Sequence, residues 1–127
     1  MEISIKVESR RTYIRIPLVM VAELSLGFQD KEGTDLFVRD FSVFGMGGYV
    51  NRSYRKGETV LVRIYLRTYE DEVIEESIMA QVRWCKRIKG ENNLAVGLIF
   101  HEMDQRQPRL YSYLRELEVM ARVISNS

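Results

Sequence analysis

Three arginines lie close together near the start of the chain. Arg10, Arg11 and Arg15 fall within six residues that contain no acidic side chain. The planar guanidinium of arginine binds phosphate oxygens and the edge of guanine through paired hydrogen bonds, and it stacks on aromatic rings. The cluster therefore has the chemistry of an anion or nucleotide site. A basic tail, or the solvated start of a strand, is the alternative that so short a cluster leaves open.

A second group of residues with binding chemistry begins 25 residues after Arg15, in the segment DFSVFGMGG at positions 40–48. Asp40 and Ser42 share a face if the strand is continuous, because side chains alternate along a strand. A carboxylate can accept the N1 and N2 protons of guanine, and arginine can donate to the O6 and N7 edge. Gly45 and Gly48 permit close approach of a ligand or of another backbone. Taken alone, the segment favours an Asx-type turn with glycine-rich bulges in a hairpin over a binding site.

Alternating hydrophobicity indicates the strands that position these groups. Apolar and polar residues alternate from Ile14 to Leu26, which predicts one long half-buried strand. Further strands are predicted near Thr34–Arg39, Val43–Val50, Val60–Leu66, Ile78–Trp84 and Leu94–Phe100. Six strands separated by polar turns predict an all-β domain, as a closed antiparallel barrel or a sandwich.

The hydrophobic period changes near the C-terminus. Apolar residues recur there at intervals of three and four, at Leu110, Leu114, Leu117, Ala121 and Ile124. This period predicts one amphipathic helix over residues 104–124. Asp104 and Gln107 have the spacing of a capping box, and Pro108 is compatible with a helix only in the first turn.

The composition excludes several classes of function. The 127 residues are 46% hydrophobic and 29% charged, as in a single globular domain, and a net charge of +1 indicates no broad surface for nucleic acid or membrane. Cys85 is the only cysteine and His101 the only histidine. With no partner spacing for a disulfide, a metal or a nucleophile–base pair, we expect no enzyme, no catalytic residue and no bound metal.

The compartment is inferred from what the sequence lacks. No apolar run approaches the roughly 18 residues of a membrane-spanning helix, and the N-terminal residues have no apolar signal-peptide core. A cytoplasmic protein without membrane insertion is therefore expected.

Together, the two groups of binding residues resemble the signature of the PilZ domain family, bacterial receptors for the second messenger cyclic di-GMP. The matching motifs are Arg11-x-x-x-Arg15 and Asp40-x-Ser42-x-x-Gly45-x-x-Gly48. The strand number, the Val82–Trp84 segment and the terminal helix are similar as well. The resemblance implies a single PilZ domain over residues 1–127. It would comprise a flexible ligand-binding segment at 1–15, a six-stranded antiparallel β-barrel at 16–101 and a C-terminal α-helix at 104–124.

The resemblance also implies roles for the motif residues. Arg11 and Arg15 would hold phosphates and guanine edges or stack on the purine rings. Asp40 and Ser42 would bind the guanine edge or the ligand backbone. Of the two glycines, Gly45 would allow the ligand to approach closely. Gly48 would mainly shape the turn.

Two further residues refine the expected ligand site. Arg10 directly precedes the arginine motif, an arrangement that in this family accompanies binding of an intercalated ligand pair. We therefore expect two cyclic di-GMP molecules per chain and no other cofactor. Trp84, the only tryptophan, has two interpretations. It could stack on a guanine, as the corresponding aromatic does in some relatives, or lie in the core, because strand alternation places it on the face of Ile78, Ala80 and Val82.

A chain of this length has room for the barrel and the helix, so the signal is expected to pass to a separate, unidentified protein partner. In this family the outputs include motility, pili, exopolysaccharide and biofilm formation. One alternative keeps the fold and drops the ligand, as a PilZ-like adaptor that works through protein contacts. Another is a small barrel that binds single-stranded nucleic acid through basic and aromatic side chains; no nucleic-acid partner is expected under the leading interpretation.

Overall fold

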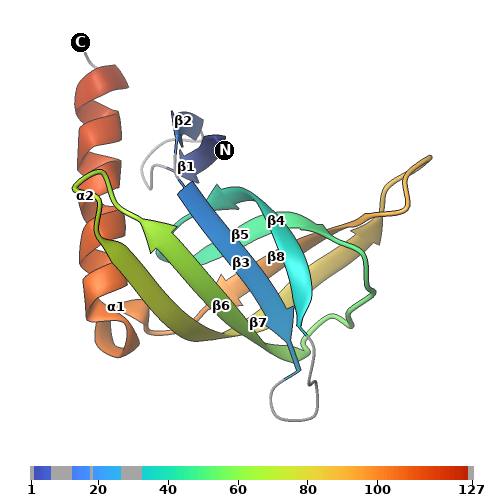
Figure 1. The fold of residues 1–127 in the computed structure, drawn as a ribbon. Helices are drawn as coiled ribbons and strands as arrows, with labels where there is room; N and C mark the ends of the chain where they lie inside the picture. Colours follow the sequence, from blue (N-terminus) through green and yellow to red (C-terminus); the bar gives the residue numbers. More distant parts are fainter. Residues whose placement is uncertain (1, 7–12, 18, 27–32, 126–127) are drawn as a thin grey trace.

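The computed structural model describes residues 2–6, 13–17, 19–26 and 33–125, and a closed barrel of six antiparallel strands forms most of it (Figure 1). The barrel strands are β3 (Val19–Ser25), β4 (Thr34–Phe41), β5 (Gly45–Val50), β6 (Thr59–Arg67), β7 (Val73–Arg87) and β8 (Leu94–Phe100). They pair in the order β4-β3-β6-β7-β8-β5, and the β4–β5 pairing closes the ring. The predicted six-stranded barrel is confirmed.

The inward faces of the strands form the hydrophobic core. Along β6, every second residue from Val60 to Leu66 is buried, whereas Arg63 and Tyr65 are exposed. This alternation is the pattern from which the sequence predicted half-buried strands. Closure of the ring leaves the outer face of the barrel as the surface on which a binding site can be built.

Two N-terminal strands extend the sheet beside β4. They are β1 (Glu2–Lys6) and β2 (Tyr13–Pro17), paired antiparallel with each other. Strand β1 also pairs parallel with β4, through Ser4 with Asp40 and Ile5 with Phe41. The expectation of a single strand from Ile14 to Leu26 is wrong, because β2 lies at the outer edge of the sheet whereas β3 belongs to the barrel.

The segment 1–15 thus contains β1 and the beginning of β2, which hydrophobic alternation did not predict. Pro17 ends β2, in agreement with the place of proline in edge strands, where a missing amide donor breaks no ladder hydrogen bond. Residues 7–12, with Arg10 and Arg11, lie outside the described part of the chain. The flexibility of the segment stays a prediction.

The C-terminal helix differs from its prediction in the first turn. A single turn, α1 (Met103–Arg106), is followed by the long helix α2 (Pro108–Ser125). The residue between them, Gln107, has φ −129° and ψ 65°, because a proline disfavours the helical conformation of the residue before it. The predicted single helix over residues 104–124 is therefore broken at Gln107.

The predicted capping box does not form. Glu102 occupies the N-cap of α1 in a left-handed conformation, and its side chain makes no capping hydrogen bond. The amide Nε2 of Gln107 instead donates to the backbone oxygen of Ser77 on β7, at 3.3 Å. Helix α2 lies beside the barrel and near β1 and β2 (Figure 1), and its buried face carries Leu110, Leu114, Leu117 and Ala121. Neither helix within the described ranges is long and apolar enough to cross a membrane.

Candidate ligand-binding site

The hairpin between β4 and β5 is shaped by Ser42. Its backbone N–H donates to the oxygen of Gly45 at 2.9 Å, and its hydroxyl oxygen accepts the N–H of Phe44 at 3.2 Å. The hydroxyl also donates to the Gly45 oxygen at 3.4 Å. Such side-chain-to-backbone bonds define a tight serine turn. Ser42 therefore fixes the geometry of the segment in which the sequence predicted a ligand contact.

A β-bulge at Arg39 turns Asp40 toward the outer face of the barrel. Val38 pairs with Gly48 and Asp40 pairs with Gly47, so Arg39 is one extra residue on β4. Beyond the bulge the alternation is inverted, because Phe41 is fully buried whereas the Asp40 side chain keeps 22% of its surface exposed. Bulges are known to redirect side chains in this way next to functional sites.

A second bulge, at Arg83 on β7, does the same for Trp84. Val82 pairs with Leu98 and Trp84 pairs with Gly97, so Arg83 has no residue opposite it. Cys85 consequently packs against the core and Trp84 lies on the outer face. Of the two interpretations of Trp84, the core position is wrong, because it assumed uninterrupted alternation along the strand.

Asp40 and Trp84 stand at the two ends of one row across four strands. Asp40 pairs with Gly47, Gly47 with Gly97, and Gly97 with Trp84. The two central strands thus carry no side chains at this level, and the outer residues lean over them. A methyl group on Gly47 would lie 2.9 Å from Oδ2 of Asp40, and one on Gly97 would lie 2.5 Å from the indole of Trp84. We call Gly47 and Gly97 the glycine floor.

The two glycines that the sequence selected serve the packing of the barrel. A methyl group on Gly45 would collide with the backbone oxygen of Leu98, and one on Gly48 with the backbone oxygen of Phe37. Both positions therefore let neighbouring strands approach. The glycine immediately beside the Asp40 carboxylate is Gly47, which the motif spacing did not single out. The predicted ligand role of Gly45 and the turn role of Gly48 stay predictions.

A hollow of about 210 Å³ lies on this outer face, and we call it the outer-face hollow. Its lining includes the predicted residues Asp40, Ser42, Gly45 and Trp84, with both residues of the glycine floor. It also includes Arg39, Phe44 and Arg83, to which the sequence gave no binding role. The only sequence signal for Arg39 and Arg83 was their position directly before the candidate residues Asp40 and Trp84.

Charged groups flank the site on both sides: an ion pair lies on β4, and a lysine lies near Trp84 on β7. The Nε of Arg39 donates to Oδ2 of Asp40 at 3.1 Å, and this hydrogen bond, followed by one to Tyr49, raises the pKa of the Arg39 guanidinium. On the other side, Nζ of Lys86 lies 5.8 Å from the ring centroid of Trp84, within cation–π range.

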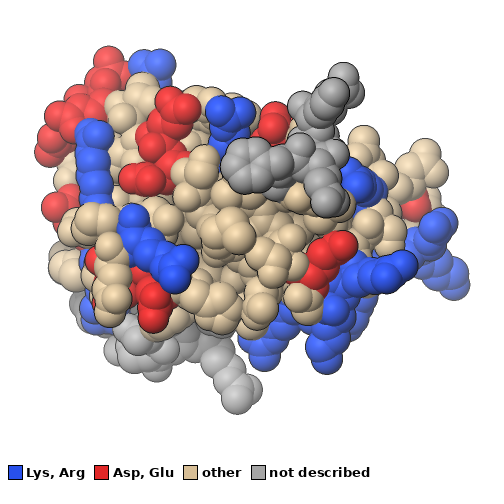
Figure 2. All heavy atoms as spheres, turned by 90° about the horizontal axis from the view of Figure 1, so that it is seen from below, with Lys and Arg blue, Asp and Glu red and all other residues tan. Residues whose placement is uncertain are grey.

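Cations and acids are also separated along the molecule. Strand β7 carries Glu75 and Glu76 near its beginning and Arg83, Lys86 and Arg87 in its second half. On the face drawn in Figure 2, Lys and Arg gather toward the end formed by the β7–β8 hairpin, and Asp and Glu are denser toward the opposite end. The outer-face hollow, with Arg83 in its lining, therefore borders the basic part of the surface.

The N-terminal arginines can be placed only in part. Arg15 pairs with Ser4, and Ser4 pairs with Asp40, so the backbones of Arg15 and Asp40 are two strand spacings apart, about 10 Å. Pairing of β1 with β4 therefore brings the second arginine of the predicted motif to the level of the predicted carboxylate. Arg10 and Arg11 lie outside the described residues.

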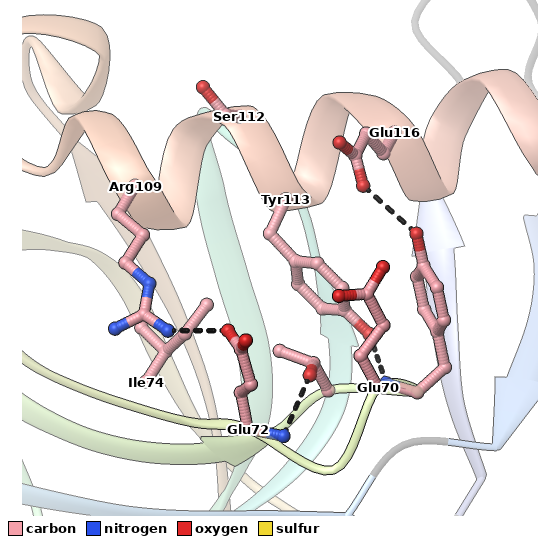
Figure 3. Close-up of a pocket in the computed structure, with 9 residues that line it drawn as sticks. Glu70, Glu72, Ile74, Arg109, Ser112, Tyr113 and Glu116 are labelled. Atoms are coloured by element: carbon pink, nitrogen blue, oxygen red, sulfur yellow. Dashed lines mark hydrogen bonds and ion pairs between the residues drawn. The ribbon is translucent and has the colours of Figure 1, made fainter.

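A second hollow, of about 360 Å³, lies between the β6–β7 turn and α2 (Figure 3) and contains no predicted binding residue. Arg109 of the helix pairs with Glu72 at 2.9 Å, and the hydroxyl of Tyr69 donates to Glu116 at 3.1 Å. The rings of Tyr69 and Tyr113 stack with centroids 5.7 Å apart. These contacts hold the turn against the helix, so we assign this hollow a structural role.

Comparisons with known proteins agree with this architecture. No curated protein matches the chain. Among solved structures it is similar to the Bacillus subtilis inhibitor of motility (MotI/DgrA), with 18% sequence identity and a TM-score of 0.59. That similarity covers 89% of this chain and 57% of the other, so the chain spans little more than half the length of that protein. The PilZ domain model matches residues 9–117, from the N-terminal arginines into α2, and the chain therefore belongs to the PilZ domain family.

Proposed function

We propose that the chain is a non-enzymatic receptor for cyclic di-GMP, the ligand that PilZ domains in general bind. The observation that carries the proposal is the row formed by Asp40, the glycine floor and Trp84. It combines a hydrogen-bond acceptor, two glycines that leave room for the flanking side chains, and an aromatic ring. A guanine base needs the acceptor for edge recognition and the ring for stacking.

Asp40 and Trp84 would divide the recognition of guanine between them. The carboxylate of Asp40 would accept the N1 and N2 protons of the base. The indole of Trp84 would stack on the purine plane, a contact worth about 1–3 kcal/mol in nucleic-acid complexes. The glycine floor supports this arrangement, since any side chain at Gly47 or Gly97 would compete with the two groups for space.

The arginine motif would supply the phosphate contacts. In this proposal Arg11 and Arg15 bind the phosphodiesters and guanine edges, and Arg10 favours a second, intercalated ligand molecule. Two cyclic di-GMP molecules per chain are therefore proposed. The pairing of β1 with β4 supports a role for Arg15, because it brings the backbone of that residue within two strands of Asp40.

Signalling would follow from ordering of the N-terminal segment by the ligand. Binding would shift a population of N-terminal conformers toward one that lies against the barrel, and so change the surface presented to a partner protein in the cytoplasm. Control of motility is the proposed output, in view of the similar structure described as an inhibitor of motility. Pili, exopolysaccharide and biofilm formation are further outputs of this family.

Calorimetric titration with cyclic di-GMP tests the proposal, with GTP as the control ligand. We expect saturable binding at two ligands per chain for cyclic di-GMP and no comparable heat for GTP. R11A and R15A should each abolish tight binding. R63A is the matched control, because Arg63 is an exposed arginine of β6, a strand outside the site, and this variant should bind as the wild type does.

The alternatives give different results in the same experiments. Absence of cyclic di-GMP binding would overturn the receptor and favour an adaptor that works through protein contacts. Strongly salt-dependent binding of single-stranded RNA, without any response to cyclic di-GMP, would favour a nucleic-acid-binding barrel. A stoichiometry near one would overturn only the paired-ligand part of the proposal.

A further inference from the structure

The two walls of the outer-face hollow are built in the same way. Each is a strand with a bulge, each bulge residue is an arginine, and the next residue is turned outward over the glycine floor. Arg39 precedes Asp40 on β4, and Arg83 precedes Trp84 on β7. Both arginines line the hollow. A bulge residue faces no partner across the ladder, so its side chain is available for another task.

The two bulge arginines differ in their surroundings. Arg39 is bound to Asp40 at 3.1 Å and contributes to holding that carboxylate. Arg83 is exposed, and no acidic side chain is paired with it among the described residues. Its closest neighbour along the chain on the outer face is Trp84, and the cation of Lys86 lies near that ring.

The balance of charges that line the hollow indicates that Arg83 could bind an anionic group. Those charges come from Arg39, Asp40 and Arg83. The first two neutralise each other in their ion pair. The net positive charge of the lining therefore comes from Arg83. An anionic ligand whose base stacks on Trp84 would meet this guanidinium on the β7 side, opposite the side at which β1 and β2 extend the sheet.

We propose that Arg83 is a phosphate-binding residue of this site. It binds a phosphodiester of the ligand through the two parallel N–H groups of the guanidinium, a geometry that lysine does not reproduce. The ligand would then be held from both sides, by Arg83 on β7 and by Arg15 on β2. This inference rests on the proposed receptor function and adds a residue that lies outside both sequence motifs.

The test compares R83A and R83K with R87A. Arg87 lies on the same strand, is also exposed and does not line the hollow, so it matches Arg83 in charge and location without sharing the proposed role. Binding of cyclic di-GMP is measured by calorimetry and by the fluorescence of Trp84, the only tryptophan. Each titration is made at low and at high salt.

We expect R83A to weaken binding roughly 10- to 100-fold, as for loss of a hydrogen bond between charged groups. R83K should lose part of that affinity, and R87A should remain within about twofold of the wild type, as expected of an exposed charge away from the ligand. The deficit of R83A should shrink at high salt, because screening weakens the charge contribution that it lacks. Unchanged thermal unfolding of R83A would show that the loss arises at the site.

Two outcomes would overturn the inference, and they are distinguishable. If the wild type binds cyclic di-GMP and R83A binds equally well, Arg83 has no role and the receptor proposal stands. A loss in R87A as large as that in R83A also removes the specific role of Arg83, because only general charge would matter. If the wild type fails to bind, the receptor proposal fails and this inference fails with it.

Discussion

The indole of Trp84 lies over Gly97, so that a methyl group on this glycine would be 2.5 Å from the ring. The two residues are paired across β7 and β8. G97A should therefore displace the indole, and with it the stacking surface of the site.

The atoms that a methyl group on Gly97 would meet belong to a side chain that can move, so the expected cost of G97A in stability is small, about 1 kcal/mol. We expect at least a tenfold loss of cyclic di-GMP affinity and a changed Trp84 emission. If G97A changed the Trp84 emission and still bound cyclic di-GMP with wild-type affinity, stacking by Trp84 would be contradicted.

Substitution of Gly48, unlike that of Gly97, should mainly lower the stability of the protein. A methyl group there would collide with the backbone oxygen of Phe37 on the paired strand β4, which cannot move without disturbing the ladder. We expect G48A to lower the free energy of unfolding by about 2 kcal/mol or more, as for overpacking. Urea denaturation checks this value, and G97A is the comparison. Equal stability of the two variants would contradict the distinction between a backbone and a side-chain collision.

Ser42 should act mainly through the hairpin turn. In S42A the N–H of Phe44 loses its acceptor, so we expect the free energy of unfolding to fall by about 1 kcal/mol. S42T keeps the hydroxyl and is the matched variant for the turn. If S42A lost affinity for cyclic di-GMP without losing stability, the hydroxyl would have to contact the ligand directly.

The stacked tyrosines between the β6–β7 turn and α2 should make the protein sensitive to high pH. Burial foremost, and then the carboxylates of Glu116 and Glu70, raises the pKa of Tyr113 above its ordinary value of 10.0, despite the opposing hydrogen bond from the Tyr69 N–H. The hydrogen bond to Glu116 likewise raises the pKa of Tyr69.

The sign of this effect follows from proton linkage. A folded-state pKa above the unfolded value means that the folded protein retains the proton more strongly, so the contribution is complete below pH 10 and is lost as the pH rises further. Urea unfolding at increasing pH, with tyrosinate absorbance, should show a smaller alkaline loss in Y113F than in the wild type. Y65F, at an exposed tyrosine of β6, is the control. An identical alkaline loss in Y113F would contradict the assignment to Tyr113.

Hydrophobic alternation was sufficient to predict half-buried strands, because strands with one buried face must alternate, whereas the choice of a barrel over a sandwich came from the family resemblance. Val60 to Leu66 shows this directly. Single-residue events such as β-bulges could not be predicted from alternation. The bulges at Arg39 and Arg83 exist only relative to a partner strand, so the sequence of one strand cannot reveal them. The outward position of Trp84 depends on such an event.

Non-local pairing limited the remaining predictions. Strand β1 joins β4 in parallel across a long stretch of chain, and no local pattern specifies that contact. The helix break at Gln107 had a local signal in Pro108, yet the contact of the Gln107 side chain with Ser77 depends on how the helix meets β7. Four of the residues for which a ligand contact was predicted, Asp40, Ser42, Gly45 and Trp84, line one hollow, and their contacts with a ligand stay predictions.

The bulge at Arg83 shifts the alternation of β7 by one residue, so the side chains beyond it lie on the face opposite to the one that regular alternation would give them. Substitution of this residue leaves the shift in place, because the extra backbone unit remains. Deletion of the residue would remove the bulge but keep the pairing of Val82 with Leu98 and of Trp84 with Gly97, so regular alternation would still place Trp84 outward and Cys85 inward. The register of β7 against β8, as much as the identity of its side chains, therefore determines whether an aromatic ring is presented to the ligand.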